Sequence, residues 1–261
     1  MSTNDLDHWE SVEVQRSAVE ADIRKSEDLR IDDAIIQRYA NPPADTMYYL
    51  EYSYHLLGDV KGLTVLDYGC GTGDNCVHIA HRGGNAVGID ISPELLELAR
   101  ARMKLHDFTE NTEFRLGSAH RLPFDDETVD VVFGIAILHH LDLESSASEV
   151  YRVLKKGGRA IFQEPVRNSK VIKFIRNLIP YEQPDLSPYE RPLTDKELKH
   201  YAKNFSGYKS REFSLPFVNL MGVLGLPEGI TRPAQKLDRA LLNNIGLLRR
   251  YASVQVVEMT K

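Results

Sequence analysis

Cysteine is scarce in this chain. Among its 261 residues only Cys70 and Cys76 are cysteines, and Cys70 lies inside a glycine-rich segment. Two cysteines in this arrangement provide neither a disulfide framework nor a four-ligand zinc site. The sequence therefore predicts no metal site, and a reducing compartment such as the cytoplasm fits this cysteine usage.

Long apolar runs and an excess of basic residues are also absent. No apolar segment reaches the length of a membrane-spanning helix, and the first eight residues are polar and acidic, unlike a secretory signal peptide. The formal net charge of -6 disfavours a general nucleic-acid-binding surface. We therefore expect a cytoplasmic protein, monomeric or homodimeric, with a small-molecule partner, no nucleic-acid partner and no integral membrane segment.

What the chain does contain is a glycine-rich turn directly after a short apolar run. Residues 65–75 read Val-Leu-Asp-Tyr-Gly-Cys-Gly-Thr-Gly-Asp-Asn, the order expected for a strand, a loop and a helix of a parallel α/β sheet. Glycines permit tight turning and let backbone N–H groups approach a ligand. Asp74 can cap the helix that follows, and it puts an anion where a dinucleotide loop would have its third glycine.

The run Asp67-x-Gly69-x-Gly71-x-Gly73 resembles the first motif of the class I S-adenosylmethionine-dependent methyltransferases. Their cofactor carries an amino-acid end and no phosphate, which agrees with the anion at Asp74. The resemblance implies that the four residues of the motif bind S-adenosylmethionine.

A second strand is expected over 85–90. It ends in Asp90, about twenty residues beyond the loop, where nucleotide-binding folds hold a ribose diol. A carboxylate can accept hydrogen bonds from both hydroxyl groups. Ser92 and Pro93 then begin a helix as its N-cap and first residue. Asp90 and its neighbour Ile91 are therefore assigned to the cofactor site.

A third strand, about 112–117, leads into Gly-Ser-Ala-His-Arg-Leu-Pro-Phe at 117–124. Members of the methyltransferase family commonly have Gly-Asp-Ala and Leu-Pro-Phe here, and their Asp accepts from the adenine amino group. In this chain that position is Ser118, whose hydroxyl oxygen can also accept from a shorter side chain. The resemblance implies cofactor contacts for Ser118 and Ala119. His120 is foreign to the pattern and is predicted to be a surface residue.

The fourth strand is predicted by a nearly continuous apolar run from 128 that ends in His139 and His140. The resemblance implies that Ile135, near the strand's end, lies beside the methionine part of the cofactor. Strand carboxyl ends face the ligand crevice in open α/β sheets, so His139 can act as a general base or orient the substrate. His140 can act in the same way or cap the next helix. A metal site at these histidines lacks further ligands at a recognisable spacing.

The fifth strand, about 159–165, follows the sequence Val-Leu-Lys-Lys-Gly-Gly at 153–158, which also resembles the family. Glu164 lies at the strand's carboxyl end, where it could face the crevice near His139. This carboxylate can orient the histidine, bind a substrate cation or act as the base. The alternative is a structural role as an acceptor for loop backbone N–H groups.

Residues 1–61 are expected to form a helical cap, with helices at about 27–40 and 45–57 separated by Asn-Pro-Pro at 41–43. Tyr48, Tyr52 and His55 share one face of the second helix. As part of a lid, these side chains would bind the substrate. The alternative is that they pack the helix onto the sheet.

After the fifth strand the motifs are fewer. A proline-rich loop, 166–193, is expected to cover the active site, and Thr194 begins a helix with a capping box. Strands are expected at 208–213 and 253–259. Between them, about 215–250 is predicted to be a helical insert that also covers the site, with a dimer contact or a membrane-surface patch as alternatives.

The motifs in this order imply an α/β, Rossmann-like, doubly wound fold over 62–261, with a mostly parallel seven-stranded sheet and an antiparallel last strand. The resemblance implies S-adenosylmethionine-dependent methylation of a small molecule, with S-adenosylhomocysteine as product. The base candidates His139 and Glu164 slightly favour O-methylation over N- or C-methylation. Two alternatives stay open: an NAD-dependent oxidoreductase, and a non-catalytic S-adenosylmethionine-binding or partner protein.

Overall fold

The computed structural model describes residues 3–169 and 190–261. Its centre is a seven-stranded sheet with the order β3-β2-β1-β4-β5-β7-β6. Neighbouring strands from β3 to β5 pair in parallel, and β7 runs antiparallel to both β5 and β6. The predicted fold class is confirmed. The strands are β1 Thr64–Tyr68, β2 Asn85–Asp90, β3 Thr112–Leu116, β4 Val129–Ile135, β5 Leu154–Pro165, β6 Gly207–Phe213 and β7 Val254–Thr260.

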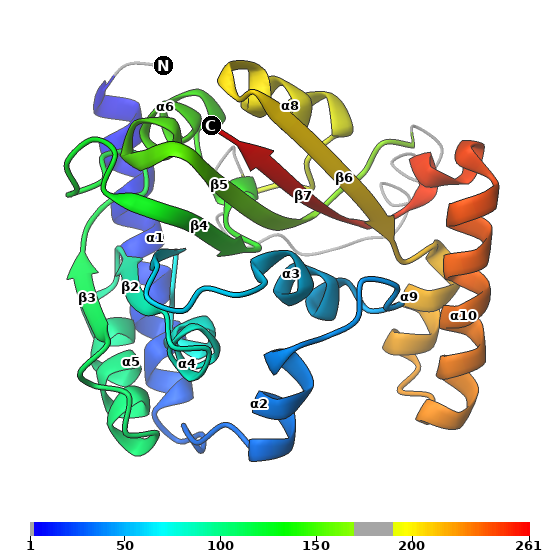
Figure 1. Ribbon diagram of the computed structural model, residues 1–261, viewed down its shortest axis with the longest axis horizontal. Coiled ribbons are helices and arrows are strands. Elements are labelled where there is room, and N and C mark those ends of the chain that lie inside the picture. Colours follow the sequence, from blue (N-terminus) through cyan, green and yellow to red (C-terminus); the bar gives the residue numbers. More distant parts are fainter. Residues whose placement is uncertain (1–2, 170–189) are drawn as a thin grey trace.

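Helices cover both faces of the sheet, with α6 and α8 above it in Figure 1 and α2, α3 and α4 below it. The helices are α1 Thr3–Arg24, α2 Asp33–Ala40, α3 Tyr49–Leu57, α4 Asp74–His81, α5 Pro93–Leu105, α6 Leu143–Val153, α8 Asp195–Tyr201, α9 Pro216–Val223 and α10 Glu228–Asn244. Short 3-10 helices are η1 Leu138–His140, η2 Ala202–Asn204 and η3 Gly246–Tyr251.

The apolar core forms one layer on each face of the sheet, because parallel strands bury both faces. Leu66 and Tyr68 of β1 belong to the layer under α6 and α8. Val65 belongs to the layer shared with α3 and α4. Successive side chains of a strand point to opposite faces, which explains this division. Burial of each such aliphatic side chain contributes about 1.5–3 kcal/mol to the free energy of folding, and this packing holds the strand ends in place.

Two predicted helix starts are confirmed, and one is wrong. Ser92 Oγ accepts from the Leu95 N–H at 3.2 Å, and Thr194 forms the predicted capping box. Asp74 is not a cap: Gly73 holds the N-cap position in a left-handed conformation, so Asp74 is already the first helical residue. Its carboxylate accepts instead from Arg102, and its negative charge still favours the helix N-terminus.

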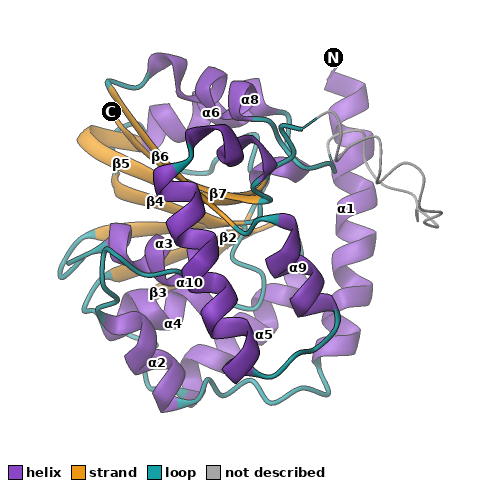
Figure 2. Ribbon diagram, turned by 90° about the vertical axis from the view of Figure 1, so that its right-hand side faces the viewer, coloured by secondary structure: helices purple, strands orange, loops and turns teal. Residues whose placement is uncertain are grey.

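The helix α1 was not predicted. It is 22 residues long, but its apolar residues do not form one stripe, and Val19 and Ile23 are both 64% exposed. Helices whose packing depends on few apolar positions give a weak periodic signal. Figure 2 shows α1 as a long helix along one side of the molecule, where it packs against α5. The region 1–61 therefore holds one more helix than the two expected from the sequence, and α2 and α3 start later than expected.

The late insert is helical, and α9 and α10 pack with η3 around Leu215, Leu242 and Ala252. Figure 2 shows α9 and α10 at the front of the molecule. Within the described ranges, every helix is too short or too polar to cross a membrane. Most of the predicted loop 166–193 lies outside the described residues. That this loop and the insert cover the active site stays a prediction.

Candidate active site

The carboxyl ends of β1, β2, β4 and β5 meet at one edge of the sheet, because these strands run parallel. The glycine loop follows β1 and is anchored to β2. The N–H groups of Gly69 and Cys70 both donate to the Ile89 carbonyl oxygen, at 3.0 and 2.9 Å. The loop therefore lies where open α/β sheets bind their ligands.

The three glycines of the loop have positive φ angles, 73° at Gly69, 49° at Gly71 and 78° at Gly73. A Cβ on Gly69 would lie 2.6 Å from Ile137 Cδ1. A Cβ on Gly73 would lie 3.0 Å from Ala99 Cβ. No atom lies within 4 Å of the Cβ position of Gly71. Packing thus requires the outer two glycines, and the middle one faces open space that a ligand can fill.

Asp90 lies beside this open position. Its Oδ2 accepts from the Gly71 N–H at 2.8 Å, and its Oδ1 accepts from the Ser92 N–H at 3.0 Å. Burial raises the pKa of Asp90, and these backbone hydrogen bonds oppose the rise. The structure thus brings Asp90, together with the half-buried Ile91, to the loop, as the sequence predicts.

Asp67 is fully buried under the loop. It accepts from Asn75 Nδ2 at 3.0 Å and from the Cys76 thiol at 3.4 Å. Burial raises the pKa of Asp67 to about 7. Asn75 in turn accepts from the Tyr54 hydroxyl at 2.7 Å, so α3 is tied to the loop through Tyr54. No sequence motif marks Tyr54, although its place on the predicted cap helix is a weak signal.

The three residues predicted to bind substrate make contacts within the cap and with β6. The Tyr52 ring lies 4.7 Å from the Arg211 guanidinium, and His55 Nδ1 lies 3.0 Å from the Pro42 carbonyl oxygen. The Tyr48 ring lies under another guanidinium, at 4.8 Å. These contacts join α3 to α2, β6 and the preceding turn, which favours the alternative that the side chains pack the cap. Their contact with substrate stays a prediction.

His139 and Glu164 form a pair at the ends of β4 and β5. His139 Nδ1 lies 2.8 Å from Glu164 Oε2, and Glu164 is fully buried. The other carboxylate oxygen accepts from the N–H groups of Ile137 and Leu138, at 2.9 and 2.7 Å. The two interpretations of Glu164, orienting the histidine and holding loop backbone, therefore apply together.

A backbone turn at Ala136 makes this pairing possible. Ala136 has φ 55°, in the left-handed region, and its N–H donates to the Gln163 carbonyl oxygen at 2.8 Å. Such a conformation costs an alanine roughly 1–2 kcal/mol. The turn directly follows Ile135 and sends Ile137 over Gly69, while η1 carries His139 onto Glu164. Ile137 therefore contacts both the glycine loop and the His139–Glu164 pair.

His140 lies against His139, with ring centroids 4.1 Å apart. Burial and then the charge of His139 lower the pKa of His140 to about 4, so it is neutral near pH 7. Donor atoms of Glu13, His140 and Glu190 lie within 4.8 Å of one another and could hold a cation. Arg16 already bonds both carboxylates, so a cation would have to displace a guanidinium.

Ser118 and Ala119 follow β3 at the same edge, and Ala119 accepts from the buried Tyr68 hydroxyl through its carbonyl oxygen. His120 is only 7% exposed, so the prediction of a surface residue is wrong. Its side chain is held by Glu10 of α1, at 2.8 Å, and by the backbone of Asp142. The sequence gives no sign of Glu10, because the helix that carries it was not recognised.

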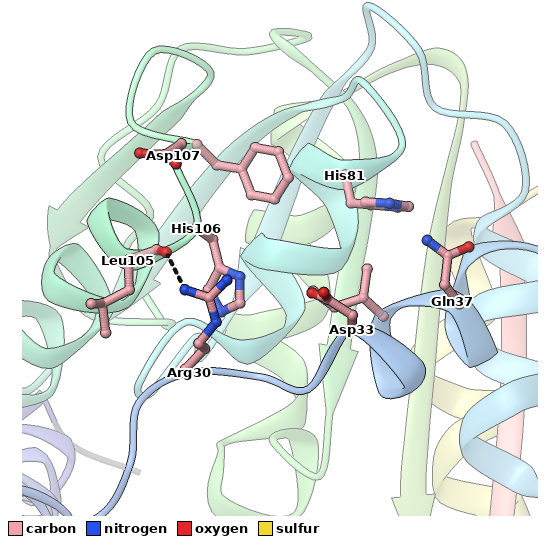
Figure 3. A pocket seen from close by; sticks show the side chains of 9 residues that line it. Arg30, Asp33, Gln37, His81, Leu105, His106 and Asp107 are labelled. Carbon is pink, nitrogen blue, oxygen red and sulfur yellow. Dashed lines mark hydrogen bonds between the residues drawn. The ribbon is translucent and has the colours of Figure 1, made fainter.

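Two cavities lie at the opposite, amino edge of the sheet. The pocket drawn in Figure 3 lies between α2, α4 and α5 and is lined in part by Arg30, His81 and His106. Its volume is about 160 Å³. A second, of about 450 Å³, is lined by the first residues of the strands, among them Thr64 and Asn85. Because α4 and α5 run back along the sheet, their last residues lie at its amino edge. Both cavities are therefore remote from the glycine loop.

The strand order β3-β2-β1-β4-β5-β7-β6 with an antiparallel β7, and a glycine loop after β1, define the Rossmann-like methyltransferase class of fold. The chain matches the family model described as a methyltransferase domain over residues 59–206, more than half of its length, and it belongs to this family.

Individual relatives differ in what they methylate. The demethylmenaquinone methyltransferase of Lactococcus lactis is 33% identical over 135 residues, which are 48% of this chain and 53% of that protein. The norajmaline N-methyltransferase of Rauvolfia serpentina is 33% identical over 138 residues, 52% of this chain and 44% of that protein. The chain thus spans about half the length of these relatives.

Solved structures share the fold at lower identity. The geranyl diphosphate C-methyltransferase from Streptomyces coelicolor has a TM-score of 0.56 and 20% identity, with 80% of this chain and 75% of that chain covered. At this identity the similarity concerns the fold alone.

Proposed function

We propose that the chain transfers a methyl group from S-adenosylmethionine to a small molecule, and that the accepting atom is a hydroxyl oxygen. The observation that carries the proposal is the His139–Glu164 pair beside the glycine loop. Ile137 joins the two, because its side chain packs over Gly69 and its N–H donates to Glu164. A candidate base is therefore next to the candidate cofactor site.

The groups at this edge suit S-adenosylmethionine better than a dinucleotide. Asp90 can accept from ribose hydroxyl groups, and Asp74 puts a carboxylate where a dinucleotide loop has its third glycine, so it would repel a pyrophosphate. Gly71 leaves room for a ligand. When bound, the cofactor supplies a methyl group on a sulfonium, which is already a good leaving group. The protein's contribution is then alignment, exclusion of water and removal of a proton.

Glu164 prepares His139 for the proton transfer. A carboxylate can only accept, so the imidazole proton lies on Nδ1 and the lone pair of Nε2 is free. When Nε2 takes a proton, Glu164 at 2.8 Å stabilises the imidazolium. A hydroxyl oxygen gains much of its nucleophilicity by losing its proton, whereas a neutral amine already offers a lone pair. A base at this position therefore favours O-methylation.

We assign the choice of acceptor to helices outside the family match and to one loop within it. The family match starts at residue 59 and ends at 206, so it leaves out α1, α2, α3, α9 and α10. We expect these helices and the loop 166–193 to form the acceptor site. Tyr48, Tyr52 and His55 are the candidates within the cap.

Calorimetry tests the cofactor first, by titration with S-adenosylmethionine, S-adenosylhomocysteine and, as control, NAD. We expect binding of the first two only; binding of NAD alone would refute the proposal. A screen of phenols, alcohols and amines with methyl-labelled cofactor then identifies the acceptor. NMR of the product shows whether oxygen, nitrogen or carbon carries the label.

The variant Gly71→Arg tests the open position in the loop. We expect S-adenosylhomocysteine binding to be lost, because a large side chain fills the space, while no protein atom within 4 Å of the Cβ position is displaced. Circular dichroism and the melting temperature check that the fold is kept. Retained binding by a folded variant would place the ligand elsewhere.

A further inference from the structure

The N-terminal helix brings a carboxylate to the loop that follows β3. Glu10 of α1 accepts from the Ser118 hydroxyl and from His120 Nδ1, the latter at 2.8 Å. Its side chain is 17% exposed and lies at the carboxyl edge of the sheet, where the cofactor site is expected. Figure 2 shows α1, the helix that carries Glu10, at the right of the molecule.

The hydrogen bonds around His120 fix the direction of the interaction. His120 Nε2 lies 3.0 Å from the backbone N–H of Asp142, which can only donate, so Nε2 is the acceptor. The ring proton of the neutral imidazole is therefore on Nδ1 and is donated to Glu10. The hydrogen bond from His120 is the main cause that lowers the pKa of Glu10, so this carboxylate is ionised at neutral pH.

Ser118 is poorly suited to replace the family's adenine-binding acid. Its hydroxyl proton is used in the bond to Glu10, and its oxygen already accepts from the His120 N–H at 3.0 Å. A carboxylate offers about four acceptor sites, and Glu10 uses two of them for Ser118 and His120. Ser118 keeps one acceptor lone pair, whereas both bonds to Glu10 reach Oε1, so the larger acceptor capacity at this position is that of Glu10 with its Oε2.

We propose that Glu10 is the residue that accepts a hydrogen bond from the adenine amino group, acting from α1 in place of the acid that the family has at position 118. Ser118 and His120 position its carboxylate. This inference rests on the proposed cofactor. It makes α1 part of cofactor recognition, so the first residues of the chain contribute to affinity although the family match begins at residue 59.

Calorimetry with two ligands tests the proposal: S-adenosylhomocysteine, and S-inosylhomocysteine, which has a carbonyl oxygen in place of the adenine amino group. The wild-type protein should bind the first more tightly, because a carboxylate accepts from an amino group and repels a carbonyl oxygen. In Glu10→Gln the ratio of the two dissociation constants should fall by about 10-fold or more. Asp22→Asn, an equal charge change on an exposed part of α1, should keep the wild-type ratio.

Moving the acid back to the family's position gives a second test. In the double variant Glu10→Gln, Ser118→Asp, the preference for the amino ligand should return. Equal binding of both ligands by the wild type would overturn the proposal, as would an equal loss for both in Glu10→Gln, which a purely structural role predicts. Tighter binding by Glu10→Gln would also overturn it. If the wild type binds neither ligand, the proposed cofactor fails instead.

Discussion

Two histidines at the carboxyl edge of this sheet, His139 and His120, each have a glutamate within hydrogen-bond distance, and they differ at the second imidazole nitrogen. In both pairs Nδ1 lies 2.8 Å from a carboxylate oxygen, His139 with Glu164 and His120 with Glu10. His120 Nε2 is occupied by the backbone N–H of Asp142. Among the described residues, none donates to His139 Nε2. Of these two histidines, His139 is therefore the one whose Nε2 lone pair no described residue occupies, so it can take up a proton.

The two pairs also differ in what holds them. Glu164 lies on β5, hydrogen-bonded to β4 on one side and β7 on the other, and it is fully buried. Glu10 lies on a helix outside the sheet. We thus propose that the same two residue types support proton transfer in a strand pair and recognition at a helix–loop contact. The proposals differ because the partner of Nε2 differs.

The largest expected effect comes from removing the base. His139→Ala should lower kcat by about 10²–10⁴-fold, the usual contribution of a general base, while the dissociation constant of S-adenosylhomocysteine stays the same. His120→Ala should act instead on that dissociation constant, because it loosens Glu10. Steady-state kinetics with the acceptor, and calorimetry, separate the two. A His139→Ala enzyme with full kcat would contradict the assignment of His139 as the base.

Glu164→Gln tests whether the carboxylate sets the imidazole tautomer. The amide has one accepting oxygen, so it cannot serve both the backbone N–H groups and His139 Nδ1. We expect kcat to fall by about 10²-fold and the free energy of unfolding to fall by about 1–3 kcal/mol. Denaturant titration measures the second quantity. Unchanged kcat in a destabilised variant would show that Glu164 only holds the loop backbone and does not affect proton transfer.

Asp67 is a buried carboxylate without a histidine partner, and it should depend on pH differently. Its pKa is about 7 in the fold against an ordinary value of 3.8, so stability is lost as pH rises from 3.8 through 7. Asp67→Asn should therefore raise the melting temperature at pH 8, by about 2–4 °C per kcal/mol of relieved burial cost, with little change near pH 4. A gain of equal size at both pH values would contradict the assignment.

His140→Phe should have the smallest effect. His140 is neutral near pH 7, so Phe keeps a planar, uncharged ring there, and we expect the added volume to cost about 1–3 kcal/mol of unfolding free energy at most. Because its pKa of about 4 lies below the ordinary 6.5, the native protein loses stability as pH falls from 6.5 towards 4. The variant should lose less over this range in thermal melts. A changed pH profile of kcat would instead make His140 part of the base.

The motif-bearing half of the chain could be predicted because its signals are local. Asp67, the three loop glycines and Asp90 lie within 24 residues, and β1, β2 and β4 are short, mostly apolar runs. Cap residues such as Ser92 and Thr194 act on N–H groups three residues away. Asp74 failed as a cap because the left-handed Gly73 begins the helix one position earlier, a detail that apolar spacing does not encode.

The sequence by itself determined the sheet, the glycine loop and the acids at the strand ends, since these follow from backbone preferences and apolar patterns over a few residues. Only the tertiary structure decided the partners: Glu164 for His139 across 25 residues, and Glu10 for Ser118 and His120 across 108 and 110. A hydrogen bond between distant positions depends on how helices and strands pack. A carboxylate or imidazole in the sequence is by itself compatible with many partners. Packing selects one of them, and with it the role of each histidine.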